Sequence, residues 1–146
     1  MKIFIASDHG GYKLKEVIKE ELKALGNKLE DLGTNSEESV DYPDFAQKLC
    51  KKVLDEKARG ILICGTGIGM SIAANKFEGI RAAVCTDSYM AQMSKEHNDS
   101  NVLCLGARVM DEKSAKKIVK VWVKTECSNE ERHGRRVGKI GSTVGG

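Results

Sequence analysis

The sequence lacks the patterns that would mark a secreted, membrane or dithiol redox protein. It has five cysteines, an odd number, with no CxxC pair, and no signal-peptide pattern opens the chain. No apolar run approaches the roughly 20 residues that a membrane span needs. The net charge of +3 is too small to indicate a nucleic-acid partner. These absences favour a cytoplasmic protein with reduced thiols that binds neither nucleic acid nor membranes.

What the sequence does contain is the balance of an ordinary globular domain. Of its 146 residues, 40% are hydrophobic and 31% are charged, which argues against disorder. This length suffices for a buried core. Because no internal repeat or linker divides the chain, we expect a single domain over residues 1–146.

Short apolar runs alternate with helical periods, and this alternation predicts the fold class. Buried strands are expected at Lys2–Ala6, Lys28–Leu32, Gly60–Cys64, Ile80–Cys85 and Asn101–Leu105. Helices are expected between them, with Gly26 ending the first, Pro43 in the first turn of the second and the third running to about Lys76. The pattern implies an α/β protein: a three-layer α/β/α sandwich with a five-stranded parallel sheet, Rossmann-like in its winding.

The stretch 126–146 differs from the rest of the chain. It is polar, basic and glycine-rich, has no strand, and is too poor in apolar residues to be core, although 129–139 suits a short helix. On a helix Arg132 and Arg136 would share a face, and two guanidinium groups on one face suit a phosphate monoester. A solvated basic tail is the plainer interpretation. Packing on a neighbouring subunit and disorder are both open at this point.

Ligands of open α/β sheets bind at the carboxyl ends of the strands, where we expect segments 7–11, 65–69 and the segment leading to His97 and Asn98. The middle segment, Gly-Thr-Gly-Ile-Gly, is the most informative, because glycines allow close approach and a following helix start favours an anion. A dinucleotide fingerprint would read GxGxxG after the first strand, and a Walker A loop would close on GK[ST]. An oxyanion site lined by glycines fits better.

Cys64 stands where a strand end meets this loop. At a helix N-terminus the pKa of a thiol can fall from about 8.5 to roughly 3.5–7.5, which makes a thiolate available as a base. The alternative is a buried core cysteine, the usual fate of a free thiol. We adopt that alternative for the remaining four, Cys50, Cys85, Cys104 and Cys127.

Asp8 and His9 follow the first strand and form a second candidate site. An acid beside an imidazole suits proton transfer, whereas the alternative is that Asp8 caps the next helix. His97 would by default be a cation at a helix C-terminus. Because His9, His97 and His133 show no ligand spacing, we expect no metal site.

Together these motifs resemble the type B ribose-5-phosphate isomerases of the ribose/galactose isomerase family. The resemblance covers nearly the whole chain in five ordered blocks: SDHGGY, VDYPDFA, CGTGIGMSIAANK, EHNDSNVLCLGARV and RHGRRVGKI. It implies interconversion of ribose 5-phosphate and ribulose 5-phosphate without metal or organic cofactor. It also implies homodimers or dimers of dimers whose active sites are shared between subunits, with the basic tail reaching over a neighbour.

The resemblance further implies a role for each matching residue. Cys64 would carry the proton between C2 and C1, Thr66 would orient the substrate, and the loop amides would hold the enediolate oxygens: Gly65, Gly67, Ile68 and Gly69. His97 would open the furanose ring with Asn98 beside it, and Asp8 would handle hydroxyl protons. Tyr42 would line the sugar pocket, and the phosphate ligands would be His9, Arg108, Arg132 and Arg136. Some relatives use a glutamate as base, but the cysteine position is filled here.

Three rival interpretations remain at this stage. The substrate could be a six-carbon sugar phosphate such as allose or galactose 6-phosphate, since the sequence does not reveal pocket length. The chain could be a non-catalytic phosphosugar-binding module, although Asp8, Cys64 and His97 exceed what binding needs. A nucleotide-binding or redox protein is disfavoured by the position of the glycine loop and by the missing CxxC.

Overall fold

The computed structural model describes residues 2–141, and the last part of the basic tail, 142–146, lies outside the described residues. All strands of its sheet run parallel in the order β2-β1-β3-β5-β4. Their bounds are β1 Lys2–Ser7, β2 Lys28–Asp31, β3 Arg59–Cys64, β4 Ala82–Val84 and β5 Val102–Gly106. The five-stranded parallel sheet predicted from the sequence is therefore confirmed.

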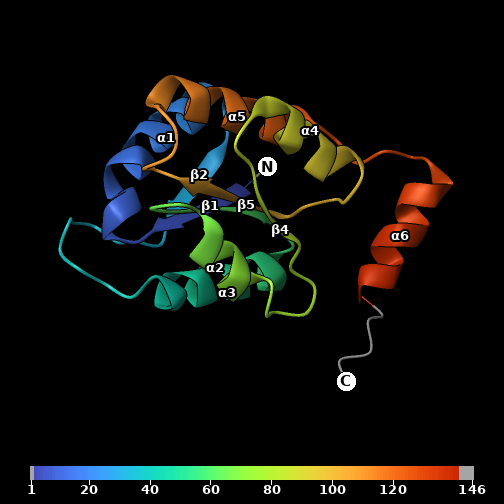
Figure 1. Cartoon of the computed structure of the whole chain (residues 1–146), viewed down its shortest axis with the longest axis horizontal. Helices are drawn as coiled ribbons and strands as arrows, with labels where there is room; N and C mark the ends of the chain where they lie inside the picture. Colours follow the sequence, from blue (N-terminus) through green and yellow to red (C-terminus); the bar gives the residue numbers. More distant parts are fainter. Residues whose placement is uncertain (1, 142–146) are drawn as a thin grey trace.

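Helices cover both faces of the sheet (Figure 1). One face carries α1 (Tyr12–Ala24), α4 (Ser88–Glu96) and α5 (Glu112–Lys124), and the other carries α2 (Tyr42–Glu56) and α3 (Ile68–Ala74). Alternate residues of β1 supply both cores: Ile3 and Ile5 enter one, and Phe4 and Ala6 enter the other. The predicted α/β/α sandwich is confirmed.

Local signals set several of the helix ends. Gly26 has a φ of +84°, which a glycine adopts without steric cost, and it follows the last turn of α1. Pro43 occupies the first turn of α2, and the Asp87 carboxylate accepts from the Met90 N–H at the start of α4, 2.8 Å.

Two predicted elements are too long. The α3 helix ends at Ala74 rather than near Lys76, because the chain then tightens into turns such as Phe77 N to Ala74 O, 3.1 Å. The β4 strand begins at Ala82 rather than Ile80, whose N–H bonds to the Phe77 carbonyl and so belongs to the preceding turn. Ile80 is buried but not in a strand, so its hydrophobicity misled the prediction.

The winding of the chain creates a crevice between β1 and β3. From β1 the chain moves to the edge strand β2, whereas from β3 it moves toward the opposite edge. Neighbouring strands whose connections diverge leave a gap at their carboxyl ends, which is where ligands bind in this class of sheet.

The segment after α5 leaves the sandwich. It leads into α6 (Glu131–Gly141), which lies beside the sandwich next to the end of α4 (Figure 1), so the short helix predicted in the tail is confirmed. Cys127 lies in this connection and is exposed, which makes its assignment to the core wrong, because no second layer of the sandwich covers it there. Within residues 2–141 no helix is long and apolar enough to span a membrane.

Candidate active site

The first candidate loop lies against the end of β3, just before the glycine loop. The Asp8 N–H donates to the Ile63 carbonyl, 3.2 Å, which ties the first loop to the end of β3. Gly11 lies so close that a Cβ there would fall 2.5 Å from the Ile63 oxygen. A side chain at this position would push the first loop away from β3, so glycine is required for the approach.

Cys64 is the last residue of β3, and its thiol faces the glycine loop. Its Sγ accepts from the Gly67 N–H, 3.2 Å, and only 5% of the residue is exposed. Gly67 has a φ of +82°, which turns the chain sharply into α3. The sulfur thus lies within hydrogen-bonding reach of backbone amides at a helix start.

The other buried thiols have a different environment. Burial raises the pKa of Cys50 to about 12 and that of Cys85 to about 11, and it also raises the pKa of Cys104. A thiol that remains protonated cannot serve as a base at neutral pH. The core assignment of these three cysteines is confirmed.

The first turn of α3 presents polar groups beside Cys64. The Thr66 hydroxyl accepts from the Ile68 N–H, 3.2 Å, and is exposed. Other N–H groups in a first helical turn have no partner within the helix and are available to an anion. The ring of Tyr42, at the start of α2, covers Gly69 so closely that a Cβ there would lie 2.8 Å from Cε1.

Arg108 follows β5 and reaches across both loops. Its backbone N–H donates to the Gly65 carbonyl, 2.9 Å. Its guanidinium lies over two glycines: a Cβ on Gly65 would be 2.9 Å from Nη1, and one on Gly10 would be 3.3 Å from Nη2. The structure therefore places one fixed positive charge at this edge of the sheet.

Asp8 and His9 are held by the backbone. The Asp8 carboxylate accepts from the Gly11 N–H, 3.0 Å, so the capping interpretation is confirmed. The His9 Nδ1 accepts from the Val40 N–H, 3.2 Å, which leaves Nε2 as the protonated nitrogen of a neutral ring. His9 can therefore donate a hydrogen bond to an anion from Nε2.

His97 and Asn98 lie at the amino ends of the strands, on the opposite side of the sheet from Cys64. The prediction that they lie at the carboxyl ends is wrong. They end α4, and the chain then returns to the start of β5, where the Asn101 carbonyl accepts from Gly60 at the start of β3, 2.9 Å. From its first residue to Cys64, β3 spans six residues, which corresponds to a length of roughly 16 Å. Within one chain His97 does not reach Cys64.

Arg132 and Arg136 lie near His97 rather than near Cys64. Both are on α6, four residues apart, as the helical pattern predicted. Arg132 forms an ion pair with Glu130, 2.9 Å, and the His97 and His133 rings stack at 4.2 Å between centroids. The predicted site residues thus form two groups, one at each edge of the sheet.

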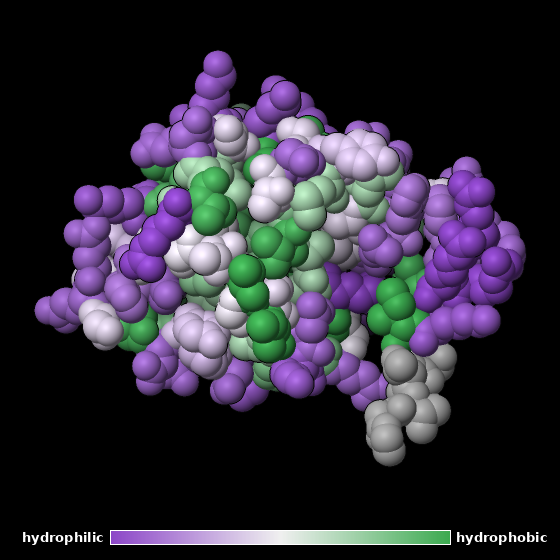
Figure 2. Space-filling view, in the orientation of Figure 1, coloured by the Kyte–Doolittle hydropathy of each residue, from purple (hydrophilic) through white to green (hydrophobic). Residues whose placement is uncertain are grey.

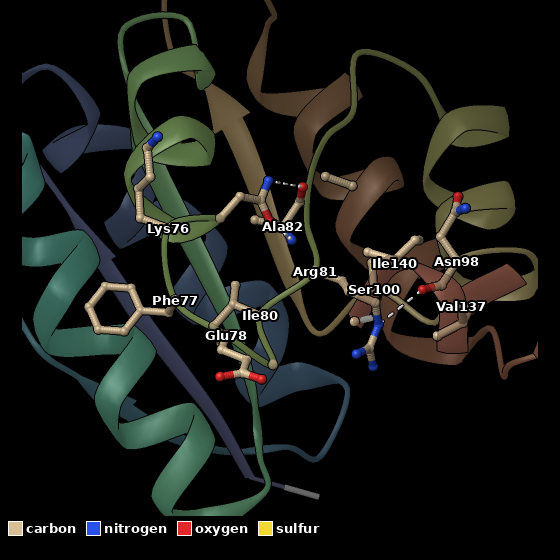
Figure 3. A pocket seen from close by; sticks show the side chains of 14 residues that line it. Lys76, Phe77, Glu78, Ile80, Arg81, Ala82, Asn98, Ser100, Val137 and Ile140 are labelled. Carbon is tan, nitrogen blue, oxygen red and sulfur yellow. Dashed lines mark hydrogen bonds between the residues drawn. The ribbon is translucent and has the colours of Figure 1, made fainter. Parts of the chain in front are cut away.

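A cavity of about 890 Å³ separates α6 from the sandwich. Val137 and Ile140 of α6 line one side, Phe77 and Ile80 the other, and Asn98 stands at the rim (Figure 3). The Arg81 guanidinium donates to the Asn98 carbonyl, 3.1 Å, and holds this corner in place. Apolar and polar side chains both line this cavity. Because the cavity lies between them, this part of α6 does not pack closely against the sandwich of its own chain.

Sequence reasoning missed a buried ion pair behind the first loop. The Lys15 ammonium is fully buried and donates to both Asp31 oxygens, 2.6 and 2.7 Å, and to the Thr34 carbonyl, 2.7 Å. The neighbouring Gly33 carbonyl accepts from Ser7, so the pair fixes the loop against the end of β1. The available signal was a lysine at the spacing of the apolar stripe that continues through Ile18 and Leu22.

Comparisons with known proteins show which family the chain belongs to. A sequence profile of the ribose/galactose isomerase family matches residues 3–140. The chain is 47% identical to ribose-5-phosphate isomerase B of Escherichia coli K12, over 95% of this chain and 93% of that protein.

Solved structures indicate the same family. Ribose-5-phosphate isomerase B of Clostridium thermocellum is 57% identical with a TM-score of 0.94, covering 97% of this chain and 96% of that one. The Thermotoga maritima enzyme is 48% identical with a TM-score of 0.93, covering 97% and 98%. The resemblance seen in the sequence motifs is confirmed, and the chain belongs to the ribose/galactose isomerase family.

Proposed function

We propose that this chain interconverts ribose 5-phosphate and ribulose 5-phosphate through an enediolate, with Cys64 as the base. The observation that carries the proposal is the thiol of Cys64 at the end of β3, bonded to the Gly67 amide beside the first turn of α3. The names and structures of the 47–57% identical relatives support the substrate.

The chemistry requires a base and a fixed electrostatic environment. Cys64 as thiolate takes the proton from C2 of the aldose and returns it to C1, so the thiolate is regenerated. Negative charge develops on the two substrate oxygens, and amides of the loop 65–69 stabilise it without reorganisation. The enediolate must not lose its phosphate, so we expect a site that excludes water.

The neighbouring groups complete the site in this proposal. Asp8, fixed by its bond to Gly11, moves hydroxyl protons, and Thr66 orients the sugar. Tyr42 lines the pocket over Gly69. Arg108 and the Nε2–H of His9 bind the phosphate, since both lie at this edge of the sheet.

We further propose that each site is shared between two subunits, in a homodimer or a dimer of dimers. Chemistry that needs Cys64 and a ring-opening imidazole cannot use His97 of the same chain, at the other edge of the sheet. A partner would supply His97, Asn98, Arg132 and Arg136, with stretch 126–146 packed over its neighbour.

Exposed hydrophobic side chains support the shared site. They lie at the start of α3 and α4 and after β5, close to the glycine loop: Ile68, Ile72, Tyr89, Met90 and Val109. Figure 2 shows hydrophobic residues gathered in the middle of this face, over α3. Apolar surface beside a polar site is typical of a face that another protein chain covers.

The experiment that tests the function compares pentose and hexose phosphates on the purified protein. We expect ribose 5-phosphate to be isomerised with a higher kcat/KM than allose 6-phosphate or galactose 6-phosphate. Faster turnover of a hexose phosphate would contradict the substrate, and binding without turnover of any would indicate a binding module. We also expect activity after exhaustive dialysis against a chelator, and a cytoplasmic location consistent with five free cysteines.

A further inference from the structure

His133 is the least exposed polar residue of α6, and the role proposed above for its neighbours leaves it unexplained. Only 5% of the residue is exposed, although α6 lies beside the sandwich. Its ring stacks on that of His97 with 4.2 Å between centroids and 32° between planes. His97 itself is exposed, so the buried ring supports the accessible one.

The contacts of His133 determine where its proton lies. The Arg132 Nε–H points at the His133 Nε2, 3.4 Å, a long hydrogen bond. A guanidinium only donates, so Nε2 must be the acceptor and the ring is neutral with its hydrogen on Nδ1. The Nδ1 atom is buried and makes no hydrogen bond within residues 2–141; the Glu130 carboxylate lies 3.8 Å away.

Most of the groups around His133 lower its pKa. Burial lowers the pKa of His133, and His97 on α4 and Arg132 and Arg136 on α6 lower it further. Glu130, just before α6, opposes them and does not reverse the shift. Two imidazolium rings in contact would repel each other, so the pair carries at most one positive charge.

We propose that His133 is a positioning residue for ring opening: it fixes the plane of the His97 ring and leaves the pair's single positive charge on His97. The inference rests on the ring-opening role proposed for His97. As imidazolium, His97 gives its proton to the furanose ring oxygen while the bond from C1 to that oxygen breaks. The C1 hydroxyl proton passes to Asp8 of the other subunit, leaving the C1 aldehyde.

The test uses two variants of the full-length protein and one control. His133→Ala removes the ring, whereas His133→Phe keeps an aromatic surface against His97 without a titrating group. Arg135→Gln is the control, since Arg135 lies on α6 but, within the described part of the chain, pairs only with Glu131, 2.8 Å, at an exposed position. Folding of each variant is checked by its thermal transition.

Two readouts are measured. Nitrogen NMR of the labelled imidazoles gives the tautomer of His133 and the titration of His97. Kinetics separates two steps. Exchange of the C1 hydrogen of ribulose 5-phosphate with solvent needs Cys64 but no ring opening, whereas conversion of cyclic ribose 5-phosphate to ribulose 5-phosphate needs both Cys64 and ring opening. If His133 had a merely structural role, its removal would lower the rates of hydrogen exchange and of isomerisation together.

We expect neutral, Nδ1-protonated His133 across the range in which His97 titrates. His133→Ala should reduce net isomerisation by about 10-fold to 100-fold with hydrogen exchange preserved, as expected for a misplaced catalytic group. His133→Phe should recover most of that loss, and Arg135→Gln should match the wild type.

The inference is overturned if His133 takes the proton before His97, or if folded His133→Ala isomerises as fast as wild type. An equal fall in exchange and isomerisation also overturns it. The proposed function has a separate failure, a wild-type protein that does not isomerise ribose 5-phosphate, and in that case the NMR titration still decides which ring carries the proton.

Discussion

Replacing Cys64 with alanine separates catalysis from folding. The substitution removes one sulfur atom from a residue that is 5% exposed, so the cavity is small and the free energy of unfolding should fall by about 1 kcal/mol. Loss of a general base typically lowers the rate by about 10²–10⁴, which corresponds to about 2.7–5.5 kcal/mol of activation free energy. The two effects therefore differ enough to be resolved.

Cys104→Ala is the matched control. Cys104 lies on β5, the neighbour of β3, and is fully buried with its pKa raised by burial. The same atom is lost there from a tighter environment, so stability should fall at least as much as in Cys64→Ala while kcat stays near wild type. The assay follows ribulose 5-phosphate formation, and urea unfolding gives the stability of each variant.

The refuting result is specific. If folded Cys64→Ala retains turnover within a few-fold of wild type, Cys64 is not the base. If Cys104→Ala loses as much activity as Cys64→Ala, the loss reports packing between β3 and β5 and not proton transfer.

Three further outcomes are expected. His97→Asn should impair conversion of cyclic ribose 5-phosphate more than that of an aldose phosphate that cannot close a ring; equal impairment would remove its ring-opening role. Arg132→Ala with Arg136→Ala should raise KM more than tenfold, since charge-assisted hydrogen bonds contribute about 1.5–3 kcal/mol each; an unchanged KM places the phosphate elsewhere. Burial alone would raise the pKa of Asp31, but hydrogen bonds from Lys15 and Lys19 lower it below its usual range. The ionised Asp31 therefore stabilises the fold above a pH of about 4, and this stabilisation is lost as the pH falls further. In urea unfolding from pH 6 to 2, the difference in free energy of unfolding between wild type and Asp31→Asn should narrow, and a constant difference would contradict the assignment.

Much of the fold could be predicted because local and global signals agree. The alternation of buried strands and amphipathic helices has one common solution, a parallel sheet covered on both faces. Gly26 and Pro43 marked helix boundaries through their own backbone preferences. The loop after Cys64 could be predicted equally well, since it combines a strand end, three glycines and a helix start.

The separation of His97 from Cys64 was missed although topology implies it. A helix between two parallel strands runs antiparallel to them, so the end of α4 returns to the amino edge of the sheet. Placing His97 by its nearness in sequence to a strand ignored that reversal. The correct placement is also what makes a second subunit necessary to the proposed chemistry.

Buried charges were missed for a different reason. Lys15 and Lys95 lie on helix faces that also carry buried residues, and sequence patterns assign lysine to solvent. Lys15 is buried because Asp31 and the Thr34 carbonyl receive its hydrogens, and these partners are distant in sequence. Burial lowers the pKa of Lys95 to about 8, and its ammonium donates to the Ser100 carbonyl, 3.0 Å. The spacing of Lys15 along the apolar stripe of α1 was a signal for its burial, but its partners could be identified only from the tertiary structure.

Subunit mixing tests the shared active site most directly. The Cys64→Ala protein is mixed with the Arg132→Ala/Arg136→Ala protein, and mass spectrometry verifies that the subunits exchange. At substrate concentrations below KM, each parent protein alone is nearly inactive. In a mixed dimer one site carries both lesions and the other carries neither, so equal mixing should restore about one quarter of wild-type activity. Complete exchange without any recovery would show that Cys64 and the two arginines act within the same chain, and would contradict the shared site.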